Sequence, residues 1–244
     1  MAGDATFEGA LELPPVEPFE AELTDWENEA LGDIAGLRVL DLTADGGETA
    51  FALARRGASV VAIGITGIDL DALEAFAEDH ELPVTFFTGG FAALPERERE
   101  RPFDLVYSGP MTVEWIENLG DWFVDAADSL RPGGTLLVYD EHPGARALAR
   151  DTEAGVLEES EDATGAPEFY EEMDVGDFIP DIPDWTMDDV LGAATAAGLE
   201  VVRVDELKGP QRFFGALDEL DPDQWPEFRD TPRAFGLIAR KPAA

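Results

Sequence analysis

The chain has 244 residues, of which 54 are Asp or Glu and 16 are Lys or Arg, so its formal net charge is −38. Such a charge repels a phosphate backbone and argues against a nucleic-acid partner. The sequence has no apolar run of about 18 residues, which argues against a membrane span, and its lack of cysteine excludes disulfides and cysteine nucleophiles. The first residues lack the basic and apolar regions of a secretory signal, so we expect a single domain in the cytoplasm.

The composition is typical of a folded, salt-adapted protein. Hydrophobic residues make up 45% of the chain, which is too many for an acidic disordered polypeptide. An acidic surface repels itself at low ionic strength, whereas molar salt shortens the Debye length to about 3 Å and screens that repulsion. Lysine is rare, occurring only as Lys208 and Lys241. We therefore expect a halophilic protein with an acidic surface; the alternative is a specific role of the charge in binding a cation.

Short apolar strands alternate with helices along most of the chain. Residues 1–35 are predicted as an N-terminal extension that contains a short helix over 24–31. The expected strands cover residues 37–42, 58–65, 83–88, 103–107, 135–139, 199–204 and 234–240. The expected helices cover residues 49–56, 69–79, 115–130 and 187–197, and Arg131-Pro132-Gly133-Gly134 is expected to stop the third of them.

This alternation predicts an α/β fold with a mostly parallel sheet and helices on both faces. Ligands of such sheets bind outside the carboxyl ends of the strands. Two acidic, proline-containing segments interrupt the pattern: residues 151–184 are predicted as an inserted lid, and residues 209–232 as an acidic loop. The candidate cleft is lined by the loops that follow Leu42, Ile65, Thr88, Tyr107 and Tyr139.

Four stretches of the chain resemble a known family. They are VLDLTADGG (39–47), FDLVYSG (103–109), the segment 115–143 with its RPGG and Glu-His-Pro motifs, and the segment 184–207. Through them the chain resembles the class I S-adenosylmethionine-dependent methyltransferases, most of all the small-molecule branch of the ubiquinone-biosynthesis type. The resemblance implies a single methyltransferase-like domain with a Rossmann-like, seven-stranded sheet whose last strand is antiparallel. It also implies S-adenosylmethionine as methyl donor and a small molecule as acceptor.

The resemblance also indicates which positions would hold the donor, and several depart from the family pattern. The family's first loop runs Asp-x-Gly-x-Gly-x-Gly, whereas Thr43 and Asp45 replace two of its glycines here. The acid that ends the second strand in the family corresponds to Gly64, and the acid after the third corresponds to Gly90 or Ala93. The resemblance places the donor contacts at Asp41, Thr43, Asp45, Gly47, Gly64, Ile65, Gly90, Phe91 and Ser108.

Three residues are candidates for the chemistry on the acceptor side. His142 follows the fifth strand and is a candidate base, or else a histidine held by the turn around it. Glu114 stands where related sequences often carry histidine, although an acid close to a helix start is also ordinary. Tyr170 lies in the predicted lid, where it contacts the acceptor or packs the lid. No spacing typical of a metal site occurs, and no metal is predicted.

Two main functions remain open at this point, and a third, weaker alternative is another nucleoside-like ligand in the same cleft. The first is an S-adenosylmethionine-dependent methyltransferase for a small molecule, with an atypical donor pocket. The second is a methyltransferase-fold protein without the activity, in a binding or regulatory role. The missing acids favour the second, because charge-assisted hydrogen bonds contribute roughly 1.5–3 kcal/mol each and their loss weakens binding by ~10²–10⁴-fold. The family-like lid, Glu-His-Pro and post-lid segments favour the first.

Overall fold

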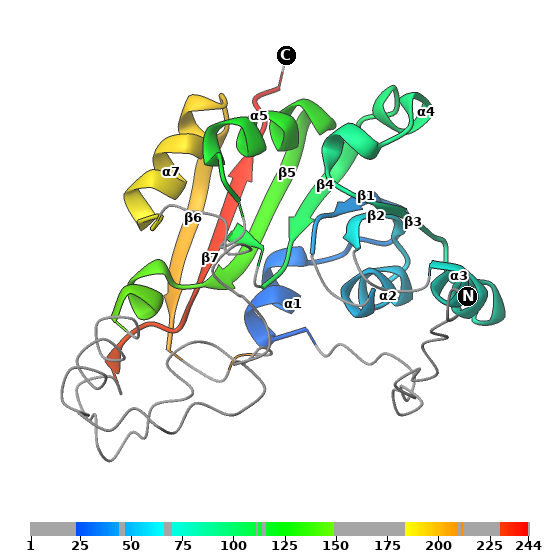
Figure 1. Ribbon diagram of the computed structural model, residues 1–244, viewed down its shortest axis with the longest axis horizontal. Helices are drawn as coiled ribbons and strands as arrows, with labels where there is room; N and C mark the ends of the chain where they lie inside the picture. The colour runs from blue at the N-terminus through cyan, green and yellow to red at the C-terminus, as the bar shows by residue number, and fades with distance from the viewer. Residues whose placement is uncertain are drawn as a thin grey trace, which may run out of the picture.

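The computed structural model describes residues 23–43, 47–65, 70–110, 112–113, 116–148, 184–208, 211 and 230–243 (Figure 1). One seven-stranded sheet organises them, in the order β3-β2-β1-β4-β5-β7-β6. The strands are β1 (Arg38–Asp41), β2 (Ser59–Ile65), β3 (Val84–Thr88), β4 (Phe103–Ser108), β5 (Leu130–Glu141), β6 (Glu200–Leu207) and β7 (Ala234–Arg240). The helices are α1 (Asp25–Leu31), α2 (Glu48–Arg55), α3 (Leu70–Asp79), α4 (Glu96–Arg99), α5 (Leu119–Ser129) and α7 (Met187–Ala196), with a short 3₁₀ turn η1 (Phe91–Ala93) and further helical residues at 143–148.

The strand directions confirm the predicted α/β fold, including its antiparallel last strand. The pairs from β3 to β5 are parallel, and β7 runs antiparallel to both of its neighbours, β5 and β6. At the centre of the sheet, Asp41 of β1 lies opposite Tyr107 of β4, and Ser108 of β4 lies opposite Val138 of β5. The ends of β1, β4 and β5 therefore meet along one border, which we call the carboxyl edge.

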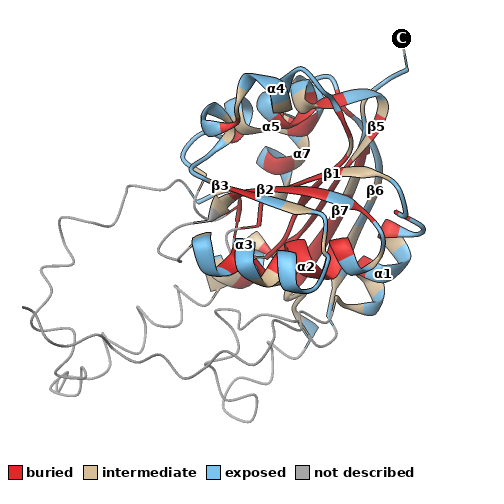
Figure 2. Cartoon of the chain, turned by 90° about the vertical axis from the view of Figure 1, so that its right-hand side faces the viewer, coloured by how far each residue is buried: buried red, intermediate tan, exposed pale blue. Residues whose placement is uncertain are grey.

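Helices cover both faces of the sheet, and the buried residues lie between the layers (Figure 2). Side chains alternate between the faces along each strand. Val106 and Val138 accordingly pack with the core under α5 and α7, whereas Tyr107 packs with the core next to α1, α2 and α3. By the same alternation, Ser108 and Asp140 continue the α5/α7 face at the carboxyl edge.

Helix α1 is fixed to the other face of the sheet. It begins with a capping box, in which the Thr24 hydroxyl accepts the Glu27 N–H at 3.2 Å and the Glu27 carboxylate accepts the Thr24 N–H at 2.7 Å. Trp26 stacks on Tyr139 of β5 and lies directly over Gly236 of β7. A Cβ on Gly236 would lie 2.1 Å from the indole ring, so only glycine allows this contact. The contact holds α1 in place and buries Glu27 beneath it.

The junction between α5 and β5 differs in part from the prediction. Helix α5 ends at Ser129, just before Arg131-Pro132-Gly133-Gly134, as predicted. Strand β5 begins at Leu130, so this segment belongs to a strand that was expected to start only at residue 135. The backbone N–H of Gly133 donates to the Lys241 carbonyl, and the backbone N–H of Lys241 donates to the Gly134 carbonyl, both at 2.9 Å. These bonds pair the segment with the residue after β7, and a register shift between β4 and β5 accommodates it. The start of α5, at Leu119, is also later than expected.

Parts of the predicted insertions fall outside the described residues. This holds for the first 22 residues of the extension, for residues 151–183 of the lid, and for most of the acidic loop. Within the described ranges, no helix combines the length and the apolar character that crossing a membrane requires.

Candidate functional site

The carboxyl edge begins at Asp41, the last residue of β1. Its buried carboxylate accepts two hydrogen bonds from Thr43, from the backbone N–H at 3.0 Å and from the hydroxyl at 2.7 Å. The Thr43 hydroxyl in turn accepts the backbone N–H of Gly109 at 2.9 Å, just after β4. Thr43, which replaces a family glycine, therefore ties the end of β1 to the end of β4 through its side chain. Asp45, the other replacement, lies outside the described residues.

Gly47, which precedes α2, is required by its backbone and by its neighbours. Its φ of +91° is a left-handed conformation that side chains rarely adopt. A Cβ at this position would lie 3.2 Å from the Phe86 ring and 3.3 Å from Leu73. The glycine thus serves the packing of the loop against β3 and α3, and the donor contact predicted for it stays a prediction.

The ends of β2 and β3 present backbone where the family carries acids. Gly64, with a φ of +90°, forms a bulge just before Ile65, the last residue of β2. A Cβ on Gly90 would meet no atom within 4 Å, so the space above β3 is open. The Phe91 ring packs edge-on against Trp122 of α5, with 6.3 Å between the ring centroids. The donor contacts predicted at Gly64, Ile65, Gly90 and Phe91 stay predictions.

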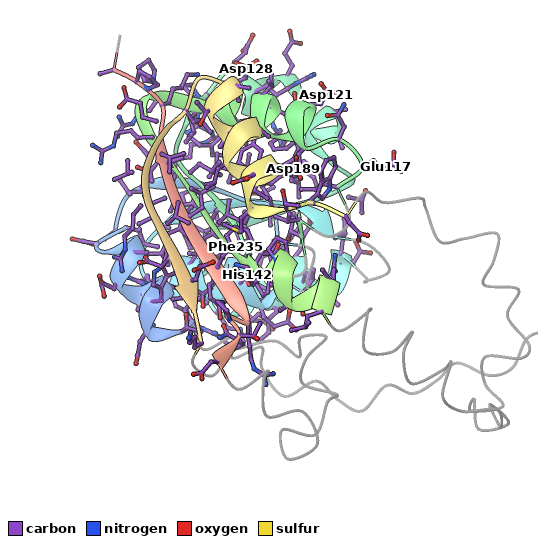
Figure 3. All side chains as sticks on the ribbon, turned by 90° about the vertical axis from the view of Figure 1, so that its left-hand side faces the viewer. Glu117, Asp121, Asp128, His142, Asp189 and Phe235 are labelled. Carbon is purple, nitrogen blue, oxygen red and sulfur yellow. The ribbon has the colours of Figure 1, made fainter. Side chains whose placement is uncertain are left out.

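Three acidic side chains are buried among the described residues, namely Glu27, Asp41 and Asp140. Asp41 ends β1 and Asp140 is the penultimate residue of β5. Glu27 accepts the hydroxyl of Tyr107, the penultimate residue of β4. Other acids, such as Asp128 of α5, are exposed on the outside of the molecule (Figure 3). Because burying a carboxylate is costly, the grouping of all three at the carboxyl edge marks a place where the fold maintains negative charge.

Asp140 holds the loop between β4 and α5. Its Oδ2 accepts the backbone N–H groups of Thr112 at 3.0 Å and of Val113 at 2.7 Å, while Oδ1 accepts the N–H of Glu141 at 2.7 Å. The loop after β4 is therefore attached to the end of β5 by one buried carboxylate.

Sequence reasoning missed both Glu27 and Asp140. The signal for Glu27 is its place three residues after Thr24, the spacing of a capping box. The signal for Asp140 is its position at the end of an otherwise apolar strand run. In a chain with 54 acidic residues, neither signal distinguishes these carboxylates from those on the surface.

His142 lies just after β5 (Figure 3), where its side chain is buried and both ring nitrogens have hydrogen-bond partners. Nδ1 accepts the backbone N–H of Gly144 at 3.0 Å, which assigns the ring proton of the neutral form to Nε2. Nε2 lies 3.1 Å from a carboxylate oxygen of Glu206, on β6. This arrangement favours the alternative in which the turn holds the histidine. A role as base would require Nδ1 to release Gly144, and it stays a prediction.

A pocket of about 240 Å³ opens beside the end of β5, between the helical residues 143–148 and the start of α7. The Trp185 indole donates to the Ile116 carbonyl at 2.8 Å and thereby joins the start of α7 to the loop before α5. Among the polar groups of the wall, Glu141 pairs with Arg146 at 3.4 Å. The apolar part of the wall comes from Val113, Pro143, Ala147, Trp185 and Met187.

Ser108 ends β4 with a buried side chain, and its hydroxyl has no hydrogen-bond partner. Glu114 and Tyr170, the other candidates for the acceptor side, lie outside the described residues. Across the described part of the chain, no group of three or more acidic, histidine or cysteine side chains is arranged to hold a metal ion.

Comparisons with known proteins agree with this architecture. A family model described as "Methyltransferase domain" matches residues 39–134, from β1 into β5. The ubiquinone biosynthesis O-methyltransferase of Maricaulis maris is 28% identical over 114 residues, which is 47% of this chain and 44% of that protein. The matched region thus spans less than half the length of this curated relative.

Solved structures share the fold at low identity. The S-adenosylmethionine-dependent methyltransferase from Mesorhizobium loti gives a TM-score of 0.57 at 21% identity, over 87% of this chain and 94% of that one. The 4+2 cyclase SpnF gives a TM-score of 0.59 at 17% identity, over 90% and 80%. A cyclase among the neighbours illustrates that this fold alone does not define an activity. The chain therefore contains a region similar to the "Methyltransferase domain" model, and its seven-stranded topology is the fold of the S-adenosylmethionine-dependent methyltransferases.

Proposed function

We propose that the protein transfers a methyl group from S-adenosylmethionine to a small-molecule acceptor. The observation that carries the proposal is the group of buried carboxylates, Glu27, Asp41 and Asp140, at the carboxyl edge of the sheet. Parallel α/β sheets bind their ligands at this edge. Buried negative charge there favours a ligand that carries positive charge, because opposite charges attract strongly where water is excluded.

The residues present fit such a donor in charge and in space. S-adenosylmethionine supplies a methyl group that is activated by a positively charged sulfonium. Asp41 and Glu27 are held in place by Thr43 and Tyr107, so their carboxylates need no rearrangement when a cation binds. Ser108 adds a buried hydroxyl without a partner, a feature that a bound ligand or water commonly explains.

The donor pocket that we propose is atypical. Gly64 and Gly90 occupy the positions at which the family places acids for the sugar and the base. Their backbone groups and the open space next to Gly90 allow binding, but they do not replace charge-assisted hydrogen bonds. We therefore expect donor affinity in the micromolar range.

The pocket beside β5 is the proposed acceptor site. Methyl transfer is an in-line displacement: the acceptor atom bonds to the methyl carbon while the carbon–sulfur bond breaks, and sulfur keeps that electron pair. The contribution of the protein is then mainly to position the acceptor and to exclude water. A base is needed only where the acceptor must lose a proton, and His142, Glu114 and Tyr170 remain our candidates for contacts on this side.

A specific observation favours a second candidate function, a binding or regulatory protein without catalysis. The acids after β2 and β3 are replaced by Gly64 and Gly90, although the chain is rich in acids everywhere else. A protein that no longer binds the donor would have no need of them.

Calorimetric titration with S-adenosylmethionine and S-adenosylhomocysteine in 3 M KCl distinguishes the two functions. Micromolar binding of both supports the methyltransferase, and Asp41→Asn should then weaken S-adenosylmethionine about 10-fold. Asp79→Asn, at the exposed end of α3, is the matched control and should leave both affinities unchanged. Millimolar binding or none overturns the proposal and supports the non-catalytic alternative.

A further inference from the structure

Two hydroxyls at the carboxyl edge are buried without a hydrogen-bond partner, those of Ser108 and Thr112. No other buried side-chain nitrogen or oxygen in the described residues lacks one. Buried polar groups are nearly always satisfied, so an exception calls for an explanation. Ser108 ends β4 and belongs to the predicted donor contacts, whereas Thr112 lies further along the loop and has no assigned role.

The backbone around Thr112 is fixed by hydrogen bonds, whereas its hydroxyl makes none. One oxygen of Asp140 accepts the N–H groups of both Thr112 and Val113, so the peptide groups of this loop cannot easily shift. The Thr112 hydroxyl makes no bond that would hold it in one rotamer. A threonine side chain has three staggered positions about its first torsion, and rotation among them moves the hydroxyl without moving the loop.

Val113, the residue after Thr112, and Asp140, which accepts the Thr112 N–H, both line the pocket beside β5. Thr112 is not itself a lining residue, so its hydroxyl reaches the pocket only by rotating. That pocket has a volume of about 240 Å³ and an apolar lining from Val113, Trp185 and Met187. A cavity of about 150 Å³ already accepts benzene, so this one is large enough for a single substituted ring. Three of the charged groups in its wall are engaged within the protein, since Asp140 holds the loop and Glu141 pairs with Arg146, and the remaining acid, Asp184, is exposed to solvent. Such a lining suits an uncharged ligand better than an ion.

We propose that Thr112 is the specificity residue of this pocket. Its hydroxyl turns toward a bound, uncharged, ring-sized acceptor and exchanges a hydrogen bond with a hydroxyl, carbonyl or amide on that ring. This inference rests on the proposed function, because it identifies the pocket with the acceptor site. A site built to hydrogen-bond a ligand group rejects analogues that lack the group, since the protein's own hydroxyl is then left unsatisfied.

Phenol and toluene form a matched pair of probes, because they have nearly the same size and differ in one hydroxyl. The methyl group of Met187 reports on the pocket, and the chain has only four methionines to label with carbon-13. In the wild-type protein, phenol should shift the Met187 signal, which Met187→Leu assigns. In Thr112→Val, which keeps the shape and removes the hydroxyl, phenol should bind about 5- to 10-fold more weakly, whereas toluene should be unaffected. Thr195→Val, at an exposed site on α7, is the control and should change neither affinity.

Several results would overturn the proposal. A Met187 signal that responds to neither probe would exclude the pocket, and equal effects of Thr112→Val on phenol and toluene would exclude the hydrogen bond. Thermal unfolding gives an independent check, because Thr112→Val should leave the melting temperature unchanged or raised. Thr43→Val should lower it, since the Thr43 hydroxyl bonds Asp41 and Gly109. A comparable loss in Thr112→Val would mean that the hydroxyl has a partner inside the protein.

The test is separable from that of the proposed function. Thr112→Val should bind S-adenosylhomocysteine as the wild type does, because the proposed role of the Thr112 hydroxyl is to bind the acceptor and not the donor. If the wild type binds phenol through Thr112 but does not bind S-adenosylhomocysteine, the pocket stands and the methyltransferase proposal fails. If the wild type binds S-adenosylhomocysteine but does not prefer phenol to toluene, the proposal for Thr112 fails and the methyltransferase proposal is unaffected.

Discussion

The two borders of the central sheet differ in where their acidic side chains lie and in what partners they have. At the amino edge, where β1, β4 and β5 begin, acids are paired with arginines. Arg38 contacts Glu98 at 2.5 Å and also lies over the Phe103 ring, and Arg131 contacts Asp104 at 2.6 Å. These groups are partly exposed, and such ion pairs contribute modest stability at little desolvation cost.

At the carboxyl edge the acids are buried instead. Glu27, Asp41 and Asp140 are held by backbone N–H groups and by the hydroxyls of Thr43 and Tyr107. A buried carboxylate contributes less to stability than an apolar side chain of similar size would. The difference supports our proposal that the carboxyl edge maintains charge for a ligand, whereas the ion pairs of the amino edge serve folding.

Salt should affect the exposed acids far more than the buried ones, and this is the largest effect we expect. Raising KCl from 0.1 to 3 M should increase the melting temperature by on the order of 10 °C, because repulsion among the surface carboxylates is screened. Differential scanning calorimetry measures it. A flat or falling melting temperature would contradict the salt-adapted interpretation of the composition.

Removal of one buried carboxylate is expected to have the next largest effect. Asp140→Asn should lower the free energy of unfolding by about 2–3 kcal/mol, because an amide keeps only one oxygen to accept the three N–H groups that Asp140 now holds. Asp128→Asn, on the exposed side of α5, should change it by less than about 0.5 kcal/mol. Urea unfolding in 3 M KCl compares the two, and equal losses would contradict the distinction between buried and surface acids.

The sequence predicted the fold well because strands and helices leave periodic patterns of apolar residues. The apolar run from Ser59 to Ile65 and the apolar spacing in α5 predict a strand and a helix from the local sequence alone. The end of α5 before Arg131-Pro132-Gly133-Gly134 was predicted correctly, but the place of this segment in β5 was missed, because its pairing depends on Lys241, more than 100 residues away along the chain. Proline and glycine normally end an element, and no local signal reveals a distant carbonyl.

The site was less predictable than the fold. The resemblance predicted donor contacts at Asp41 and Ser108, which stay predictions. Periodicity does not show which of many acids is buried, and so Asp140 and Glu27 were missed. The unsatisfied hydroxyl of Thr112 is a property of three-dimensional packing alone. The composition did not help to locate the site, because the many surface acids cannot be told from the few buried ones in the sequence.

The smallest effect concerns the amino edge and its dependence on pH. Burial acts to raise the pKa of Asp104, but the backbone N–H of Arg38 and the Arg131 side chain outweigh it, so the pKa lies below its ordinary value of 3.8. The ionised form is then favoured by folding, and its contribution is present above that ordinary value and disappears as the pH falls through the folded pKa. Asp104→Asn should cost about 1 kcal/mol at pH 7 and progressively less below pH ~4.

Asp125 of α5 gives a control of opposite sign. Burial, together with the neighbouring charges of Asp121 and Asp128, raises its pKa, so folding disfavours the ionised form. Asp125→Asn should therefore stabilise the protein at pH 7, by only a few tenths of a kcal/mol because the site is well exposed to solvent, and the gain should vanish as the pH falls below the raised pKa. Urea unfolding of both variants and the wild type between pH 7 and pH 3, in 3 M KCl, measures the two trends. Deviations of the same sign would contradict the account of the amino edge, because they would mean that general charge repulsion, and not the pairing with Arg38 and Arg131, governs Asp104.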